Sequence, residues 1–248
     1  MKINQYLDAT YLKTINQANI SEDENQQKVI DLIREAILYH YKLIMIRAKH
    51  IPLAKKMLLE ANSDVLIGTV IDFPEGNSSI KSKLEEAKKA ILLEADELDF
   101  VVNYKAFKKG EIEVIKSEIL ECTKLCLENS KVVKFIIEVA ALSTEEIIAI
   151  SQLIKEVVLT NFDETAAKRV FVKSSTGFFK TIDNKPNGAT LETMKLISEN
   201  AKPLQIKAAG GVRDYGTALK MICLGVNRIG TSSAKEICTK QENNNSEY

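Results

Sequence analysis

Residues 204–230 read LQIKAAGGVRDYGTALKMICLGVNRIG, and this stretch decides the fold. It opens with a short apolar run at Leu204–Ala208 and continues with apolar residues at three-to-four spacing over Asp214–Leu224. It closes with a second short run at Asn227–Gly230. The pattern predicts a strand, a helix and a strand. Two strands joined by such a crossover helix lie parallel in one sheet.

The same alternation extends outward from this stretch over nearly the whole chain. Short apolar runs predict further strands at Gln5–Ala9, Lys42–Ile46, Val65–Ile71, Glu97–Val102, Val132–Glu138 and Val170–Ser174. Amphipathic segments predict helices at Asp23–His40, Ile51–Ala61, Ser79–Glu94, Glu111–Asn129, Thr144–Val158 and Ala189–Asn200. Strands at roughly 30-residue spacing favour a closed barrel. No Gly-x-Gly-x-x-Gly follows the first strand, as a dinucleotide-binding sheet would require. We therefore expect one α/β domain, a (β/α)8 TIM barrel over residues 1–239.

Length, composition and charge agree with a single barrel and exclude some partners. The chain has 248 residues, of which 45% are hydrophobic, and its 34 basic residues balance its 34 acidic ones. Because there is no net charge to attract nucleic acid or anionic lipid, we expect neither as a partner. No apolar run approaches the length of a membrane span, and the start, MKINQYLDAT, lacks the apolar run of a signal peptide. We expect a cytoplasmic protein.

The histidines and cysteines predict no metal site. The chain has two histidines, His40 and His50, and four cysteines. Cys122 and Cys126 stand four apart on a predicted helix with no further ligand nearby, and the cysteine spacing is too irregular for a disulfide framework. We expect no metal and no cofactor.

Charged residues stand in predicted strands where apolar side chains are the rule. Asp99, Lys173 and Lys207 each alternate with aliphatic residues, so all three should point into the barrel. Active residues of such barrels lie at the carboxyl ends of strands, where Lys173 and Lys207 stand on neighbours about 4.8 Å apart. A nearby like charge and burial both disfavour the ammonium form, and a partly neutral lysine can attack a carbonyl. The pair predicts a Schiff-base lysine with a cationic helper.

Other inward charges have a simpler interpretation. Lys134 and Glu138 share one face of their predicted strand, and Glu97 shares the face of Asp99. Ion pairs inside the barrel would account for all three residues. We therefore interpret Lys134, Glu138 and Glu97 as structural support in preference to direct catalytic groups.

Two glycine-containing loops predict an anion site. Gly210-Gly211 precedes the helix that begins near Asp214, and Gly230 with Ser232 and Ser233 opens the last helix. Glycine lets the backbone approach a phosphate, and helix amino termini present free N–H groups. Loops after the seventh and eighth strands are a frequent phosphate site in barrels. We therefore expect a phosphorylated ligand.

These segments, in this order, resemble the deoxyribose-phosphate aldolase family. The resemblance runs from LDATYLK at Leu7–Lys13 to IGTSSA at Ile229–Ala234, with ADELDFVVNY, VKSSTGF and IKAAGG between them. It implies a class I aldolase that reversibly cleaves 2-deoxy-D-ribose 5-phosphate to acetaldehyde and D-glyceraldehyde 3-phosphate. It also implies a homodimer.

The resemblance implies a role for each motif position. Lys173 falls on the Schiff-base lysine, Lys207 on the second lysine that lowers the pKa of the first, and Asp99 on the proton-relay aspartate. The phosphate-binding positions fall on Gly177, Gly210, Gly211, Gly230, Ser232 and Ser233.

The chain departs from the family pattern at three places. The second strand reads LIMIRAKHIP, without the cysteine and asparagine of the usual VCVNP. Asp8-Ala9-Thr10 stands where the family has Asp-His-Thr, which leaves Asp8 as a supporting candidate, and Glu94 stands in place of a glycine. The first two departures border the substrate end of the barrel.

Two rival functions stay open at this point. One is another Schiff-base phosphosugar aldolase or transaldolase, whose longer substrate would need polar groups near the second strand, such as Arg47 and Lys49. The other is a catalytically silent phosphosugar-binding barrel, which would have no use for Lys173, Lys207 and Asp99 together.

The last residues predict a flexible polar tail over 240–248, reading KQENNNSEY. Nine extended residues could span about 30 Å, enough to return from the far end of the last helix to the mouth of the barrel. We expect that Tyr248 could there carry a proton to or from the reacting carbon.

Overall fold

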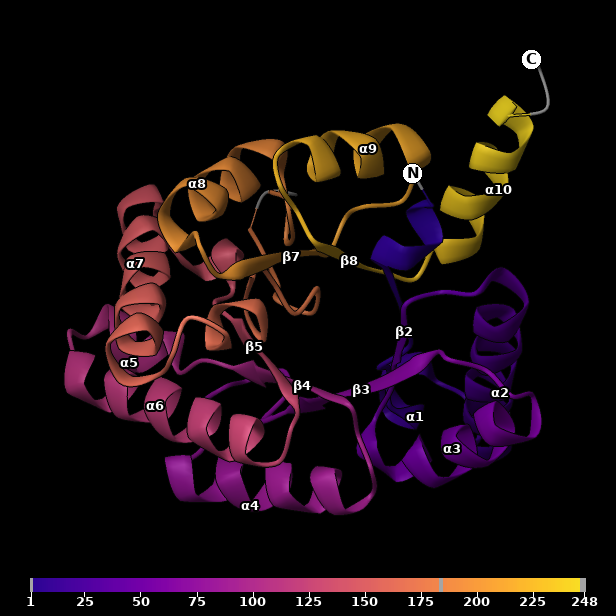
Figure 1. Ribbon diagram of the computed structural model, residues 1–248, viewed down its shortest axis with the longest axis horizontal. Coiled ribbons are helices and arrows are strands. Elements are labelled where there is room, and N and C mark those ends of the chain that lie inside the picture. Colours follow the sequence, from indigo (N-terminus) through magenta and orange to yellow (C-terminus); the bar gives the residue numbers. More distant parts are fainter. Residues whose placement is uncertain (1, 183–184, 246–248) are drawn as a thin grey trace.

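Eight parallel strands form one closed barrel in chain order in the computed structural model, which describes residues 2–182 and 185–245. The ring closes where β1 pairs with β8. Figure 1 shows the strands as a central ring with the helices around it. The strands are β1 Leu7–Thr10, β2 Leu43–Met45, β3 Leu66–Ile71, β4 Glu97–Val101, β5 Val132–Ile136, β6 Val170–Lys173, β7 Gln205–Ala209 and β8 Arg228–Thr231. The predicted fold is confirmed.

The helices cover the outside of the barrel, and several begin where the sequence supplies a cap. Ser21, Ser143 and Thr190 each accept the N–H three residues ahead and form a capping box. The helices are α1 Ile15–Ala18, α2 Glu22–Tyr39, α3 Ile51–Glu60, α4 Ile80–Leu92, α5 Tyr104–Lys108, α6 Ile112–Glu128, α7 Thr144–Asn161, α8 Leu191–Ala201, α9 Tyr215–Cys223 and α10 Ala234–Asn245. None of the helices in the described ranges is long and apolar enough to cross a membrane.

The main core lies between the barrel and its helices. The outward strand residues Ile44, Phe100, Phe135, Val172 and Ile206 are buried there against the helices. Because strand side chains alternate, their neighbours in sequence point into the barrel. The alternation thus sends the charged residues of β4, β5, β6 and β7 inward, as predicted.

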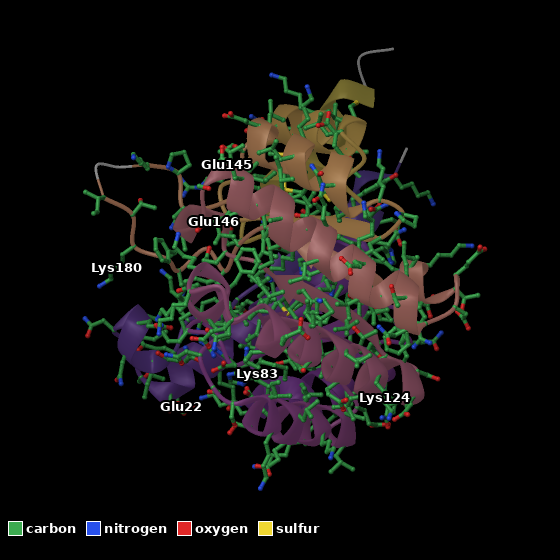
Figure 2. All side chains as sticks on the ribbon, turned by 90° about the vertical axis from the view of Figure 1, so that its left-hand side faces the viewer. Glu22, Lys83, Lys124, Glu145, Glu146 and Lys180 are labelled. Carbon is green, nitrogen blue, oxygen red and sulfur yellow. The ribbon has the colours of Figure 1, made fainter. Side chains whose placement is uncertain are left out.

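The carboxyl ends of the strands define one end of the barrel as the functional end. Figure 2, with the barrel on its side, places Glu22, Glu145 and Glu146 near the starts of α2 and α7 toward that end. Lys180, in the connection after β6, lies there too, whereas Lys124, near the end of α6, lies toward the opposite end.

Two predicted boundaries are wrong. β5 ends at Ile136, and Glu138 adopts a left-handed backbone conformation with φ 59°, so it no longer follows the strand alternation. The backbone of α10 continues to Asn245, into the segment expected as a tail from residue 240. Lys240, Gln241 and Glu242 are residue types with high helix propensity, so the helix can continue into this segment. Tyr248 lies outside the described residues.

Candidate active site

Asp99 lies at the centre of three lysine side chains inside the barrel. Its Oδ2 accepts hydrogen bonds from Lys173 Nζ at 2.8 Å and from Lys207 Nζ at 2.9 Å. Its Oδ1 accepts one from Lys134 Nζ at 2.8 Å. All four side chains are buried. The register places Lys173 directly beside Lys207, so the neighbouring lysines predicted from β6 and β7 are found.

This arrangement shifts the pKa values of the nucleophile candidate and its partner in opposite directions. Burial, with the positive charges of Lys207 and Lys134, lowers the pKa of Lys173 to about 8 against the opposing effect of Asp99. Burial alone would raise the pKa of Asp99, but the three lysines hold it well below its usual range. Lys173 can therefore become neutral near physiological pH while Asp99 stays ionised.

A second layer of charges lies beneath the lysines. Asp8 Oδ2 is 2.5 Å from Lys207 Nζ, and Asp8 Oδ1 accepts a hydrogen bond from Arg228 Nε at 2.6 Å. Both Nη atoms of Arg228 donate to the carboxylate of Glu97 at 3.1 Å. Glu97 is also 2.5 Å from Lys134 Nζ. Asp8 therefore gives Lys207 a second carboxylate partner besides Asp99.

Arg228 was not among the site residues predicted from the sequence. The period-two rule used for Asp99 and the lysines would have found it, because Arg228 alternates with the outward Ile229 in β8. Its planar fork makes a bidentate contact with Glu97 while Nε holds Asp8, an arrangement that a lysine in the same place could not make. The supporting role expected for Asp8, Lys134 and Glu97 agrees with this ion-pair layer.

Glu138 has a different setting from the one predicted. Its carboxylate is buried and accepts hydrogen bonds from the N–H and hydroxyl groups of Thr176 instead of sharing a strand face with Lys134. Burial raises the pKa of Glu138, and the two Thr176 bonds and Lys173 oppose that shift. Thr176 follows Lys173 by three residues. Glu138 thus fixes the turn that follows Lys173, the candidate nucleophile.

The predicted phosphate loops approach each other through glycine backbones. Gly177, Gly210 and Gly211 have φ of 78°, 79° and 86°, which glycine adopts without strain. A Cβ on Gly188 would lie 2.4 Å from the carbonyl oxygen of Gly210, so only glycine fits there. Gly188 was not predicted from the sequence, because its packing partner, Gly210, lies in another loop.

The loop after β8 joins the loop after β7. The Thr231 hydroxyl donates to the carbonyl oxygen of Val212 at 2.7 Å and accepts the N–H of Ser233 at 2.9 Å. Ser232 is exposed, and Ser233 is half-buried, immediately before α10. The candidate anion positions after β6, β7 and β8 therefore form one continuous rim, although the Ser233 N–H already has a protein acceptor.

Metal ligands do not gather in the same way. Across residues 2–182 and 185–245, no three His, Cys, Asp or Glu side chains are grouped so that they could hold a metal ion.

Comparison with known proteins gives a consistent family. The sequence profile of a family described as DeoC/LacD family aldolase matches residues 10–240. A deoxyribose-phosphate aldolase of Thermococcus kodakarensis is 39% identical over 224 residues, which cover 90% of this chain and 93% of the relative. A deoxyribose-phosphate aldolase of Mycoplasma capricolum subsp. capricolum is 37% identical over 98% of this chain and 97% of its own length.

Solved structures agree with the sequence comparison. The structure named "QR15, an Aldolase" has a TM-score of 0.79 at 31% identity and covers 98% of this chain and 97% of its own. An N-acetylmannosamine-6-phosphate 2-epimerase from Clostridium perfringens has a TM-score of 0.57 at 10% identity, and that likeness concerns the fold alone.

Proposed function

This chain belongs to the DeoC/LacD family of aldolases, and on that basis we propose that it reversibly cleaves 2-deoxy-D-ribose 5-phosphate to acetaldehyde and D-glyceraldehyde 3-phosphate. The observation that carries the proposal is the buried Lys173–Asp99–Lys207 arrangement, in which Lys173 is the last residue of β6. The pKa of Lys173, about 8, gives a usable fraction of neutral amine at neutral pH.

Each bond change in the proposed reaction has a group to support it. The neutral Lys173 Nζ attacks the aldehyde carbon of the sugar, and loss of water gives an iminium ion. The C2–C3 bond then breaks, its electrons neutralise the iminium to an enamine, and the C3 hydroxyl loses its proton as glyceraldehyde 3-phosphate leaves. Protonation of the enamine and hydrolysis release acetaldehyde and Lys173.

Asp99 and Lys207 are placed to serve the proton transfers. Because Asp99 Oδ2 contacts both lysine nitrogens, a proton can pass between Lys173 and Lys207 without a change of side-chain position. The ionised Asp99 also stabilises the iminium charge. We assign the phosphate of the substrate to the rim formed by Gly177, Gly210 and the residues after β8.

The alternative hypothesis, an aldolase or transaldolase with a longer phosphosugar substrate, finds less support. Lys49 Nζ is 2.5 Å from Glu22, and Arg47 donates to two backbone carbonyl groups. Both cations near β2 therefore have protein partners that a longer substrate would have to displace.

A cleavage assay on matched phosphosugars tests the proposal. With 2-deoxy-D-ribose 5-phosphate we expect acetaldehyde and glyceraldehyde 3-phosphate in equal amounts. With D-ribose 5-phosphate we expect cleavage at least about a hundredfold slower, because an added hydroxyl would need a buried hydrogen-bond partner. Equal rates, or cleavage only of a longer sugar phosphate, would favour the other aldolases, and no cleavage at all would favour the silent barrel. The homodimer and the cytoplasmic location stay predictions, to be tested by sedimentation and cell fractionation.

A further inference from the structure

The mouth of the barrel is apolar on one side. Beside the charged cluster lies a group of packed apolar side chains at or just beyond the carboxyl ends of β1, β2, β3 and β6. We call this group the apolar wall, and it consists of Leu12, Met45, Val70, Phe73 and Phe178. Its member Phe178 directly follows Gly177 of the rim in the connection after β6.

Phe73 is the central member of this wall. Its ring meets the ring of Phe178 edge-on, with centroids 5.0 Å apart. Phe73 also packs against a second apolar cluster that contains Val101 and Ile136. Ile136 is the register partner of Lys173 in the neighbouring strand. The wall therefore extends to the immediate neighbour of the nucleophile.

Arg47 is a polar residue that contacts two members of the apolar wall, Leu12 and Phe73. Its Nε donates to the carbonyl oxygen of Leu12 at 2.9 Å, and its Nη1 donates to that of Phe73 at 3.2 Å. Its Cζ lies 4.9 Å from the centre of the Phe73 ring. One half-buried guanidinium thus ties the loop after β1 to the loop after β3 and supports the ring between them.

We propose that Arg47 is a positioning residue that holds the apolar wall over the donor carbon and thereby restricts the enzyme to a two-carbon aldehyde donor. The inference rests on the proposed function, because it needs a carbon nucleophile formed on Lys173. The phosphate rim lies after β6, β7 and β8, so the acceptor part of the substrate extends toward that side. The donor carbons, bound to Lys173, then lie beside Ile136 and Phe73, where the apolar wall reaches the neighbour of the nucleophile.

The wall would act on the fate of the enamine. The enamine carbon can attack the carbonyl carbon of glyceraldehyde 3-phosphate, whose oxygen takes up a proton. Alternatively it can take a proton from water, and hydrolysis then returns acetaldehyde. A rigid apolar wall excludes water from that carbon and leaves little room for an extra methyl group. The same contacts would therefore control both water access and donor size.

The matched variants are Arg47→Ala, Arg47→Lys and, as a control, Lys49→Ala. Lysine keeps the positive charge but cannot make the two fork contacts and the ring contact together. Lys49 lies two residues away, is exposed and pairs with Glu22, so its removal changes local charge without changing the wall. The measurements are the ratio of propanal to acetaldehyde as donor and the ratio of deuterium exchange into acetaldehyde to aldol formation.

We expect Arg47→Ala to raise the propanal-to-acetaldehyde ratio about tenfold, the discrimination that one methylene provides in a tight pocket. The exchange-to-aldol ratio should rise with it. Arg47→Lys should resemble Arg47→Ala, and Lys49→Ala should resemble the wild type. If Arg47→Ala does not fold, Arg47→Lys decides. A mere loss of stability would lower all rates together and leave both ratios unchanged.

Two results would overturn the inference. Ratios within twofold of the wild type in Arg47→Ala and Arg47→Lys would show that Arg47 does not position the wall. Alternatively, Arg47→Lys could keep both wild-type ratios while Arg47→Ala shows a salt-dependent increase in KM for the phosphorylated substrate. Arg47 would then act as a charge that attracts phosphate. Failure of the wild type to form any aldol would instead refute the proposed function.

Discussion

Two lysine nitrogens share a single oxygen atom of Asp99, and this contact connects the charge states of all three side chains. Lys173 has the least external support, because Lys207 also pairs with Asp8 and Lys134 also pairs with Glu97. Burial and the positive charges of the two neighbouring lysines lower the pKa of Lys173 to about 8. The ion pairs thus distinguish Lys173, the candidate nucleophile, from the other two lysines that contact Asp99.

Removal of the second lysine tests this selection. In Lys207→Leu the positive neighbour of Lys173 is lost, whereas Asp99 remains, so the pKa of Lys173 should rise. The rising limb of the rate profile, expected near pH 8 in the wild type, should move upward by about one pH unit. Measurement of kcat/KM against pH checks this. An unmoved limb with full activity would leave Lys207 a purely structural role.

Removal of the Asp99 carboxylate should shift the pKa of Lys173 in the opposite direction. Asp99 raises the pKa of Lys173, so Asp99→Asn should lower it and move the rising limb to lower pH. The maximal rate should fall at least about a hundredfold, because the bridge between the two lysines is lost. The same pH series provides the measurement. A limb that moves upward would contradict the proposed electrostatic order.

At the scale of strands and helices, a second buried ion pair connects elements outside the barrel interior. Lys83 of α4 donates to Glu118 of α6 at 2.7 Å and to the carbonyl oxygens of Gly76 and Val101 at 3.0 and 2.6 Å. Figure 2 labels Lys83 among the packed helices. The contact ties two helices to the end of β4, two residues beyond Asp99.

Loss of this lysine should destabilise the fold. Lys83→Met leaves the buried Glu118 without its cation, which costs about 3–5 kcal/mol. Chemical denaturation measures the loss, with Lys81→Met as the control, since Lys81 is exposed on the same helix. Adding Glu118→Met to Lys83→Met should recover part of the stability. A single variant as stable as the control would show that the pair contributes nothing.

The sequence predicted strands better than the contacts between them. Period-two alternation correctly sent Asp99, Lys173 and Lys207 inward, because a strand fixes side-chain direction locally. It failed at Glu138, since a single left-handed residue breaks the alternation and no local pattern signals it. The pairing of Lys83 with Glu118 was also out of reach, because it depends on how two separate helices pack.

At the scale of the whole molecule, the chain end is placed differently from the sequence expectation. α10 begins beside the phosphate rim and packs against the 3₁₀ turn Ile3–Tyr6 that precedes β1, so it runs away from the mouth. Residues 240–245 belong to α10, and a helix advances about 1.5 Å per residue instead of the 3.3–3.6 Å of an extended chain. The estimate of a 30 Å reach is therefore wrong.

The role expected for Tyr248 stays a prediction, because Tyr248 lies outside the described residues. If Tyr248 carries protons at the enamine, deletion of residues 247–248 should slow deuterium exchange into acetaldehyde more than it slows overall turnover. The thermal midpoint should stay the same, because the deletion removes no residue of α10 as far as Asn245. Equal exchange and turnover in the shortened and full-length enzymes would remove Tyr248 from the mechanism.

The closed barrel brings residues from all eight strands to one end, and we assign the covalent step there to Lys173. Borohydride reduction in the presence of acetaldehyde, followed by mass mapping of the peptides, tests that assignment most directly. We expect an ethyl group on Lys173 in the wild type, no adduct in Lys173→Ala, and retained folding in that variant. An adduct on Lys207 or Lys134, or no adduct in an active enzyme, would contradict the assignment.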